Sequence, residues 1–482
     1  MNNTYGHDTK EPRTDHRLIF RVFLFLLPFL GALFRPAAAQ WVKAYGRDTS
    51  DIPCSIRETP DGGLVLAGIS KYSSSGATEA TTWVGCLSPG GEVRWWTSFR
   101  GAVLTDLYGD YSTVLPLEDG GFFLAATYKA SLSAASCLLA AKLDGQGRVV
   151  WQRLYGWPGA GPLDRLFKVA DAEATPDHGF LVAGAASEAE NAPWHLWVAK
   201  LDIDGTILWQ KAYPASLSGE ARALAQGAEG TIFVAGVSLA WGIGGCDYWV
   251  LHLDPAGRII WQTACGGPQN DIPRGLAASP DGGCLVVGET SSFGTAASSP
   301  DSWLVKLDAA GRPDWQKLFP APGEDRAEAA VLTSDGGFIV SGAAQRGPNT
   351  DATLLKITAD GRLEWRKTFG SSAGFYKFSN EAAVDAVELR GGGYAAAAST
   401  SEMGAFENDL LVLKVTAHGE AAACAASRDD PLAGTDTAAV VIPTTAVETP
   451  TAAVLNPVVA PSVDLAWSAK PICPGKTKKS RR

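Results

Sequence analysis

Two kinds of side chain in this sequence could contact a ligand: tryptophans outside every repeated position, and carboxylates that open short predicted strands. Tryptophan anchors many binding surfaces because its ring is large and apolar and carries an N–H donor. Paired carboxylates can also serve as acid and base on a polysaccharide. The alternative roles are loop packing for the rings, and turn capping or solvation for the carboxylates. We expect the ligand-binding residues to include Trp157, Trp194, Trp241, Asp110, Asp271 and Asp325.

The other reactive residues fit no familiar catalytic or metal-binding spacing. Four histidines follow residue 39, and they read as variants of the repeat described below: His178, His195, His252 and His418. The sequence has no zinc-like His/Cys spacing, no Gly-x-Ser-x-Gly elbow and no phosphate loop. Residues 202–205 (DIDG) offer two carboxylates without the rest of a calcium loop. We therefore predict no catalytic residue, no metal and no cofactor.

Composition narrows the class of protein. The chain has 482 residues, of which 46 % are hydrophobic and 19 % charged, so it can bury a large core. Its 53 glycines and 16 tryptophans, against 2 methionines, favour strands and turns over long helices. The formal net charge is −10, which repels phosphate backbones. Nucleic acid is therefore not an expected partner.

Residues 1–39 have the pattern of an export signal. Arg13, Arg17 and Arg21 precede the apolar run 22–34, which is too short to span a bilayer, and the small residues 37–39 follow. We predict cleavage after Ala39 and a periplasmic, secreted or cell-surface location, without a stable membrane span. The alternative is an uncleaved anchor.

Two phrases alternate along the rest of the chain. The first is a hairpin around Asp-Gly-Gly, as in PDGGLVLAG (60–68) and SDGGFIVSG (334–342). The second is the phrase DSWLVKLDAAGRPDWQKLF (301–319), which aligns without gaps with 195–213 and 247–265. Its closing tryptophan recurs every 50 to 58 residues, at Trp95, Trp151, Trp209, Trp261, Trp315 and Trp365. The chain therefore contains seven units, each with four strand signals and two tight hairpins.

Seven such units predict an all-β, seven-bladed β-propeller over residues 40–420. A β-solenoid is the alternative, but its coils do not need two tight hairpins each. The seventh unit ends at 420 without a tryptophan strand, and WVKAYG (41–46) has the form of the missing strand. We therefore expect the N-terminal strand to complete the last blade.

The combination DGGxxxxG followed by WLxKLDxxGxxxWQKxxG resembles the tandem β-propeller repeats of secreted bacterial proteins, the delta-60 and quinoprotein (PQQ-type) blade repeats. The resemblance covers roughly residues 41–420. It implies the propeller fold, but it implies no particular function, since propellers carry many.

Repetition itself argues that the recurring residues are structural. We expect the closing tryptophans to pack neighbouring blades together, as should the third-strand rings Trp83, Trp197, Trp249 and Trp303. The turn carboxylates should cap backbone N–H groups: Asp144, Asp202, Asp254 and Asp308. Cysteines in strands should be small buried hydrophobes: Cys54, Cys86, Cys137, Cys265 and Cys284. Cys246 has no evident partner.

Residues 421–475 are rich in Ala, Val, Thr and Pro and lack both phrases, and a basic tail follows at 476–482. We expect an extended appendage, with strands laid on the propeller as one form of it. Cys424 and Cys473 frame this segment, and in an exported chain we predict that they form a disulfide. Two free thiols are the alternative.

If strands a to d of each unit alternate in direction, the short a–b and c–d hairpins share one face. The variable b–c and d–a connections then share the other face, which we call the loop face, and variable loops on a repeated scaffold are where binding usually occurs. The sequence thus predicts a monomeric, non-catalytic binding or scaffolding module for an extracellular glycan or protein. The alternative is a propeller enzyme that acts on polysaccharide through carboxylates at the channel mouth.

Overall fold

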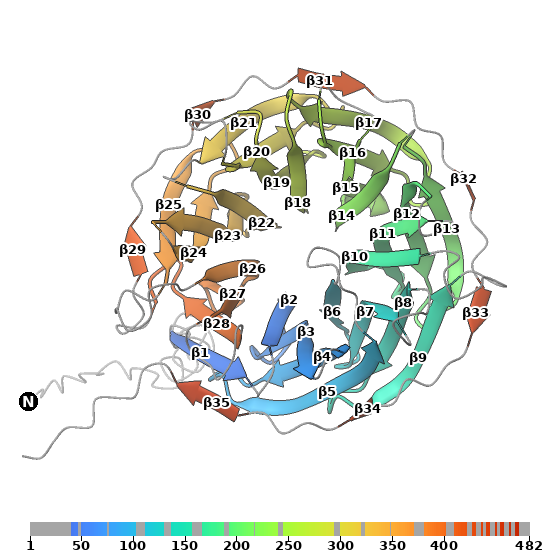
Figure 1. The fold of residues 1–482 in the computed structure, drawn as a ribbon, viewed down its shortest axis with the longest axis vertical. Coiled ribbons are helices and arrows are strands. Elements are labelled where there is room, and N and C mark those ends of the chain that lie inside the picture. Colours follow the sequence, from blue (N-terminus) through green and yellow to red (C-terminus); the bar gives the residue numbers. More distant parts are fainter. Residues whose placement is uncertain are drawn as a thin grey trace, which may run out of the picture. The chain divides into compact units, whose positions relative to one another are not determined.

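Seven antiparallel sheets stand side by side in a ring in the computed structural model, which confirms the seven-bladed β-propeller (Figure 1). The structure describes residues 40–421, and beyond them seven short strands. The gaps within 40–421 are 47–49, 75–76, 103–110, 130–135, 157–165, 188–191, 216, 240–243, 294–298, 320–322, 348, 371–379 and 402–408.

Each of the first six blades takes four consecutive strands, named a to d from the ring axis outward. The strands are, for blade 1, β2 Ser50–Glu58, β3 Leu64–Ser74, β4 Ala77–Leu87 and β5 Val93–Ala102; for blade 2, β6 Ser112–Pro116, β7 Phe122–Lys129, β8 Ser136–Leu143 and β9 Val149–Gly156; for blade 3, β10 Leu166–Ala174, β11 Phe180–Ser187, β12 Trp194–Leu201 and β13 Ile207–Tyr213. Blade 4 has β14 Gly219–Gln226, β15 Ile232–Ser238, β16 Asp247–Leu253 and β17 Ile259–Gly266, with a 3₁₀ turn at Ala228–Gly230; blade 5 has β18 Asp271–Ala278, β19 Cys284–Thr290, β20 Asp301–Leu307 and β21 Pro313–Phe319; blade 6 has β22 Asp325–Leu332, β23 Phe338–Arg346, β24 Asn349–Ile357 and β25 Leu363–Phe369.

Blade 7 combines the two ends of the propeller sequence. Strands β26 Glu381–Glu388, β27 Tyr394–Thr400 and β28 Asp409–Val415 pair in order, and β1 Trp41–Gly46 pairs antiparallel with β28. Trp41 is 9 % exposed and its indole N–H donates to the Pro89 carbonyl of blade 1 at 3.0 Å. The N-terminal strand therefore completes the last blade, as the sequence predicts.

The short hairpins form because glycine supplies the backbone angle that their turns need. In the a–b turns Gly62 and Gly282 have φ of +81° and +83°, and His178 takes the same place with φ of +62°. In the c–d turns a carboxylate oxygen of Asp144 accepts two backbone N–H groups, from Gln146 and Arg148, each at 2.9 Å. These turn carboxylates are caps, as expected.

The repeated tryptophans join neighbouring blades. Trp95 of strand d in blade 1 donates to the Gly145 carbonyl in the c–d turn of blade 2 at 3.1 Å, and Trp261, Trp315 and Trp365 do the same one blade further on. The third-strand rings Trp83, Trp197, Trp249 and Trp303 are at most 2 % exposed. Both sets are structural, which confirms the argument from repetition.

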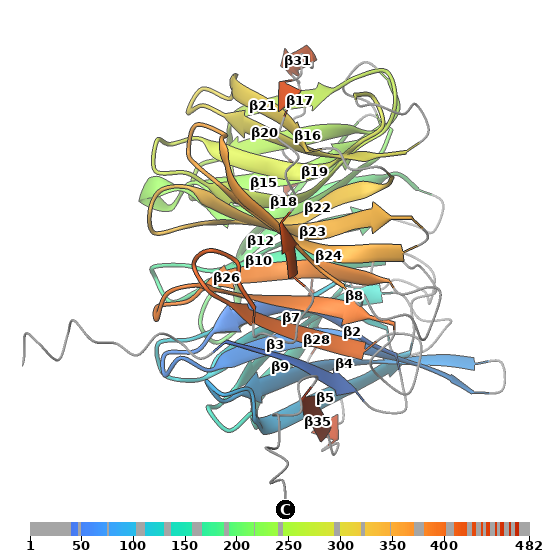
Figure 2. The ribbon, with the colours of Figure 1, turned by 90° about the vertical axis from the view of Figure 1, so that its left-hand side faces the viewer.

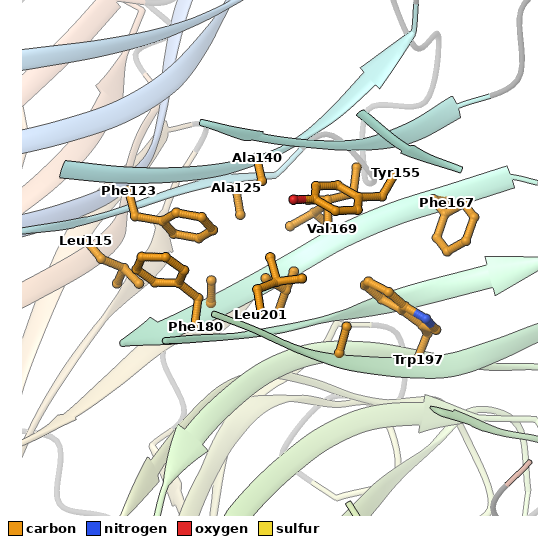
Figure 3. Packing of buried hydrophobic residues seen from close by; sticks show 14 of the residues in the cluster. Leu115, Phe123, Ala125, Ala140, Tyr155, Phe167, Val169, Phe180, Trp197 and Leu201 are labelled. Atoms are coloured by element: carbon orange, nitrogen blue, oxygen red, sulfur yellow. The ribbon is translucent and has the colours of Figure 1, made fainter. Parts of the chain in front are cut away.

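Aromatic rings also fill the space between blades 2 and 3 (Figure 3). Phe123 of β7 and Phe180 of β11 stack with ring centroids 3.7 Å apart, and Tyr155 and Trp197 lie in the same cluster. Packing of this kind between adjacent sheets supplies the core of a propeller.

In several blades an ion pair joins the Asp of the a–b turn to the Lys of strand c. Blade 4 lacks both residues. Lys306, whose side chain is 2 % exposed, lies 2.7 Å from Asp281, and Lys356 lies 2.9 Å from Asp335. In blade 4 the turn carries no Asp, and His252 replaces the Lys and stacks on Phe233 at 4.1 Å. His252 is therefore a repeat variant rather than an isolated reactive group.

The side view separates the two faces of the ring (Figure 2). Short hairpins lie along one face, and the long β3–β4 hairpin of blade 1 projects furthest from the other, the loop face.

Beyond residue 421, each blade receives a fifth, outermost strand from the C-terminal segment (Figure 1). These strands are β29 Ser427–Asp429, β30 Thr435–Asp436, β31 Val440–Pro443, β32 Thr449–Pro450, β33 Val454–Asn456, β34 Ser462–Val463 and β35 Ser468–Pro471. Among the described residues no helix is long and apolar enough to cross a membrane.

Candidate functional site

A cavity of about 580 Å³ lies on the axis of the ring, enclosed by the innermost strands of the blades. This volume falls in the range of sites that hold small molecules. Its walls are the a strands β2, β6, β10, β14, β18, β22 and β26. Because these strands occupy equivalent positions, residue types that the fold requires should recur in them, and charged residues that do not recur need another explanation.

A β-bulge in six of the seven innermost strands turns one extra residue of each toward the cavity. The register of each a strand against its b strand shifts at this point, whereas the described β6–β7 pairing has no shift. Bulges re-aim side chains and are common beside functional sites. The bulge residues that line the cavity are Cys54, Ala170, Arg222, Arg274, Glu328 and Val384.

The position after the bulge lies where neighbouring innermost strands meet, and in some blades it links them. Asp385 of blade 7 accepts the Ile56 N–H at 2.9 Å, and Asp171 of blade 3 accepts the Leu224 N–H at 3.1 Å. In blade 5 this position is Gly275, where a Cβ would lie 2.6 Å from the Ala329 backbone. The blades thus approach most closely here, and either a small residue or a hydrogen-bond acceptor fits.

One group of charges, which we call the arginine cluster, comprises Arg274, Arg326, Glu289 and Glu328. Arg274 lies 3.0 Å from Glu289 and 3.4 Å from Glu328, and Arg326 lies 2.5 Å from Glu328. Burial disfavours the charged form of Glu328, but the two guanidinium groups outweigh it and lower its pKa. Two guanidinium groups therefore face two carboxyl groups in this cluster.

A second group, which we call the carboxylate cluster, comprises Arg57, Asp171, Glu173 and Asp385. Arg57 pairs with Asp385 at 2.5 Å, and no ion pair satisfies the other two carboxylates within the described part of the chain. Burial raises the pKa of Asp171 to about 6 and that of Glu173 to about 7, while Arg57 opposes the shift. The cavity therefore holds carboxyl groups that exchange protons near neutral pH.

A third group joins the loop-face ends of blades 3 and 4 to the cavity wall, and we call it the mouth cluster: Trp194, Lys168, Glu220 and Arg222. The Lys168 ammonium lies 4.5 Å from the Trp194 ring centroid and 3.4 Å from Glu220, and Glu220 lies 3.5 Å from Arg222 in the cavity wall. These contacts connect Trp194 to the cavity.

Exposed apolar side chains adjoin the mouth cluster. Leu217 and Leu239 are 62 % and 48 % exposed. The backbone N–H of Leu239 donates to the Ser218 carbonyl, and the backbone N–H of Trp194 donates to the Ser218 hydroxyl. Exposed apolar residues beside a half-buried tryptophan are typical of binding surfaces.

The structure places the other expected site residues as follows. Asp271 and Asp325 are 0 % and 1 % exposed, beneath the surface that a ligand would touch, and this burial raises the pKa of Asp271. The hydroxyls of Thr290 and Ser292 donate to Asp271, which supports the turn-holding interpretation. Three expected ligand residues and both expected disulfide partners lie outside the described residues: Asp110, Trp157, Trp241, Cys424 and Cys473.

Three of the five strand cysteines follow the expectation. Cys86, Cys265 and Cys284 are buried, and burial raises the pKa of each thiol. Cys137 is only half-buried, and Cys54, also half-buried, occupies a bulge and lines the cavity. No group of three or more His, Cys, Asp or Glu residues in the described part could hold a metal ion.

Sequence reasoning missed the arginine and carboxylate clusters. A signal existed, because an alignment of the innermost strands puts Arg222, Arg274 and Glu328 where other blades carry Ala170 or Val384. Those strands are the least repetitive in sequence and carry a bulge, so alternation alone misassigns which side chains face the axis.

A scan against protein-family models found no match, and no curated protein matches the sequence. Similar solved structures include a protein of unknown function from Dyadobacter fermentans, with 11 % identity and a TM-score of 0.42 over 79 % of this chain and 98 % of that one. They also include Sqt1 of Chaetomium thermophilum, with 11 % identity, a TM-score of 0.42 and coverage of 77 % and 97 %. A glucose dehydrogenase has 12 % identity, a TM-score of 0.36 and coverage of 64 % and 97 %. The fold assignment rests on the seven sheets of this chain, and membership of a particular repeat family stays a prediction.

Proposed function

We propose that this chain is an exported, non-catalytic binding module whose ligand enters the axial cavity from the loop face. One observation carries the proposal: charged residues break the seven-fold repeat where the innermost strands face the cavity. Burying Arg222, Arg274 and Glu328 costs desolvation, and equivalent blades keep the same backbone with Ala170 or Val384. The fold therefore does not need these charges, whereas recognition of a polar ligand does.

The chemistry of the walls favours a glycan over an apolar ligand. Guanidinium and carboxylate groups form paired hydrogen bonds with neighbouring hydroxyls, and a tryptophan at the entrance can stack on a sugar ring. The mouth cluster supplies this ring in Trp194 and leads to Arg222 in the wall. A protein ligand that inserts a polar loop is the other form of the proposal. We propose that the module acts as a monomer in an extracellular or periplasmic space and binds no nucleic acid.

The test uses the chain from Gln40 to Arg482 on a glycan array, followed by calorimetry with the best ligand. Arg222→Ala and Trp194→Ala should each weaken binding by about tenfold or more, which is the size of one lost anchor. Arg258→Ala is the matched control, since Arg258 is 71 % exposed in a c–d turn on the opposite face. Binding that neither variant weakens would place the ligand elsewhere, and binding of proteins without any glycan would correct the ligand class.

A second candidate is an enzyme that acts on polysaccharide. The carboxylate cluster favours it, because Glu173, with a pKa of about 7, could donate a proton while another carboxylate stays ionised. Release of reducing ends from a polysaccharide panel, abolished by Glu173→Gln with the fold intact, would support catalysis. Binding without any product would leave the module non-catalytic.

A further inference from the structure

The C-terminal segment contains a seven-residue repeat with one unit for each blade. Divided from residue 426, it reads ASRDDPL, AGTDTAA, VVIPTTA, VETPTAA, VLNPVVA, PSVDLAW and SAKPICP, and it ends at residue 474. The fourth position of every unit is Asp or Pro. We call residues 426–474 the strap and its units heptads 1 to 7.

Each heptad contributes one strand, and the strands follow the ring in order. Heptad 1 supplies β29 to blade 6, and the next heptads supply blades 5, 4, 3, 2 and 1 in turn. Heptad 7 supplies β35, which pairs with β1 in blade 7. The seven strap strands therefore follow one another once around the outer edges of the propeller (Figure 1).

All seven pairings share one register. The third residue of each heptad lies opposite the residue three positions after the repeated tryptophan of strand d. The pairs are Arg428 with Thr368, Thr435 with Leu318, Ile442 with Ala264, Thr449 with Ala212, Asn456 with Leu154, Val463 with Ser98, and Lys470 with Ala44. The strap repeats every seven residues and the propeller every 50 to 58 residues, yet the same heptad position pairs with the same position of the outer propeller strand in every blade.

We infer that the seven outer strand edges form one docking surface for a heptad-repeat strand, and that the strap is its built-in occupant, held by its seven-residue phase rather than by the identity of each heptad. This inference is independent of the proposed binding function. It identifies a second interaction surface on the rim of the propeller, away from the axis.

The strap pairs with backbone groups at the outer edge of each blade that would otherwise have no partner strand. Each blade would otherwise present the unpaired backbone groups of a d strand to solvent, which invites pairing with other chains. Every strap strand pairs through only two to four residues, so each contact is weak alone. Once one heptad is paired, the short connection holds the next heptad near its own blade, so the strap binds as a multivalent unit.

The fourth position also suits an outermost strand. It lies opposite the residue two positions after the tryptophan, as Pro443 does with Thr263 and Pro471 with Lys43. Proline has no N–H to offer to a further strand, and charged residues oppose edge-to-edge association. The Asp or Pro of each heptad therefore ends the sheet at the strap.

The test is hydrogen–deuterium exchange, followed by mass spectrometry, of the d strands in two variants of the chain from Gln40 to Arg482, both with Cys424→Ser and Cys473→Ser so that no disulfide holds the ends of the strap. The first variant lacks residues 447–453, which are heptad 4 on blade 3. If phase alone positions the strap, heptads 5 to 7 move back one blade each, and the uncovered strand is β1 of blade 7. The second variant replaces 447–453 by seven Gly and Ser residues, so the other heptads keep their blades and only β13 of blade 3 is uncovered. We expect exchange about tenfold or more faster in the uncovered strand.

Protection of the innermost strands serves as the internal reference for an intact ring in both variants. Faster exchange at β1 in the deletion and at β13 in the replacement supports the inference. Faster exchange at β13 in the deletion would show that each heptad belongs to one blade and would overturn the phase mechanism. Unchanged exchange in every d strand of the replacement variant would show that the strap does not dock.

Discussion

Two glutamates in the walls of the axial cavity should respond to substitution in opposite ways. Glu173 in β10 belongs to the carboxylate cluster, where burial raises its pKa from the ordinary 4.5 to about 7. Glu328 in β22 belongs to the arginine cluster, where Arg274 and Arg326 overcome burial and lower its pKa. We predict that Glu173→Gln stabilises the protein at pH 8 and that Glu328→Gln destabilises it.

The signs follow from proton binding in the folded and unfolded states. Folded Glu173 holds its proton more tightly than unfolded Glu173, so its ionisation lowers the free energy of unfolding as pH rises from about 4.5 through about 7. Between about pH 5 and pH 8 that loss amounts to about 2.5 kcal/mol before screening. Water in the cavity screens the charge, so we expect a gain of about 1 kcal/mol from Glu173→Gln at pH 8 relative to pH 5.

Glu328 is the matched control because it lies in an equivalent innermost strand. Its lowered pKa stabilises the fold above its unfolded value, and that stabilisation is lost only as pH falls through the folded pKa. Removal of its charge also leaves Arg274, whose side chain is only 16 % exposed, with one carboxylate fewer, at a cost of roughly 3 kcal/mol. Unlike the effect of Glu173→Gln, this loss should be the same at about pH 5 and about pH 8.

The assay is thermal unfolding by intrinsic tryptophan fluorescence of the wild type and both variants at the two pH values. We expect Glu173→Gln to raise Tm at pH 8 by about 2 °C relative to its effect at pH 5. A pH-independent effect of Glu173→Gln would refute the raised pKa, and with it the proposal that the carboxylate cluster exchanges protons near neutral pH.

Three further predictions test the remaining assignments. Deletion of Trp41–Gly46 behind an intact export signal should lower Tm markedly, because it opens two strand edges of blade 7 and removes a tryptophan whose truncation alone costs roughly 3–5 kcal/mol; equal Tm values for the deleted and complete forms would contradict it. Cys424 and Cys473 should be found as one linked peptide in non-reducing mapping, because β29 and β35 next to them lie on the neighbouring blades 6 and 7, and the bond would close the strap at a gain on the order of 4 kcal/mol; alkylation of both thiols in native protein would reject the pairing. Substitution of Trp157, Trp194 and Trp241 together by Ala should abolish ligand binding with little change in Tm, whereas early unfolding of that variant would make these rings structural.

The fold and the closure of the ring were predictable from sequence because both depend on local, repeated features. Each Asp-Gly-Gly turn and each Trp strand is set by residues close together in the chain, and seven copies reinforce one another. WVKAYG (41–46) could be placed in blade 7 because its form matches strands elsewhere, such as WQRLYG (151–156). Periodicity also correctly assigned Trp95 and Asp144 to packing and capping, since a residue required in nearly every blade serves the scaffold.

The candidate site was only partly predictable, because it is assembled across blades. Trp194 was found from sequence as a ring outside the repeat, but its connection through Lys168 and Glu220 to Arg222 depends on how β10, β12 and β14 meet. Asp271, in contrast, has the right type and position in sequence yet points into hydroxyl partners of its own blade. Spacing along the sequence cannot tell the half-buried Trp194 from the fully buried Asp271, since each residue begins a strand on the loop face.

By itself, the sequence determined the number of blades and the two hairpins of each blade, because both recur as periods along the chain. Only the tertiary structure decided which charges share the axial cavity and which heptad pairs with which blade. A β-bulge changes the face that a side chain occupies without changing its place in the sequence, so Arg274 and Glu328 meet only once the ring is closed. The match between the strap and the blades likewise joins residues up to several hundred positions apart, such as Ala44 and Lys470, through backbone pairing whose partners cannot be read from residue type alone.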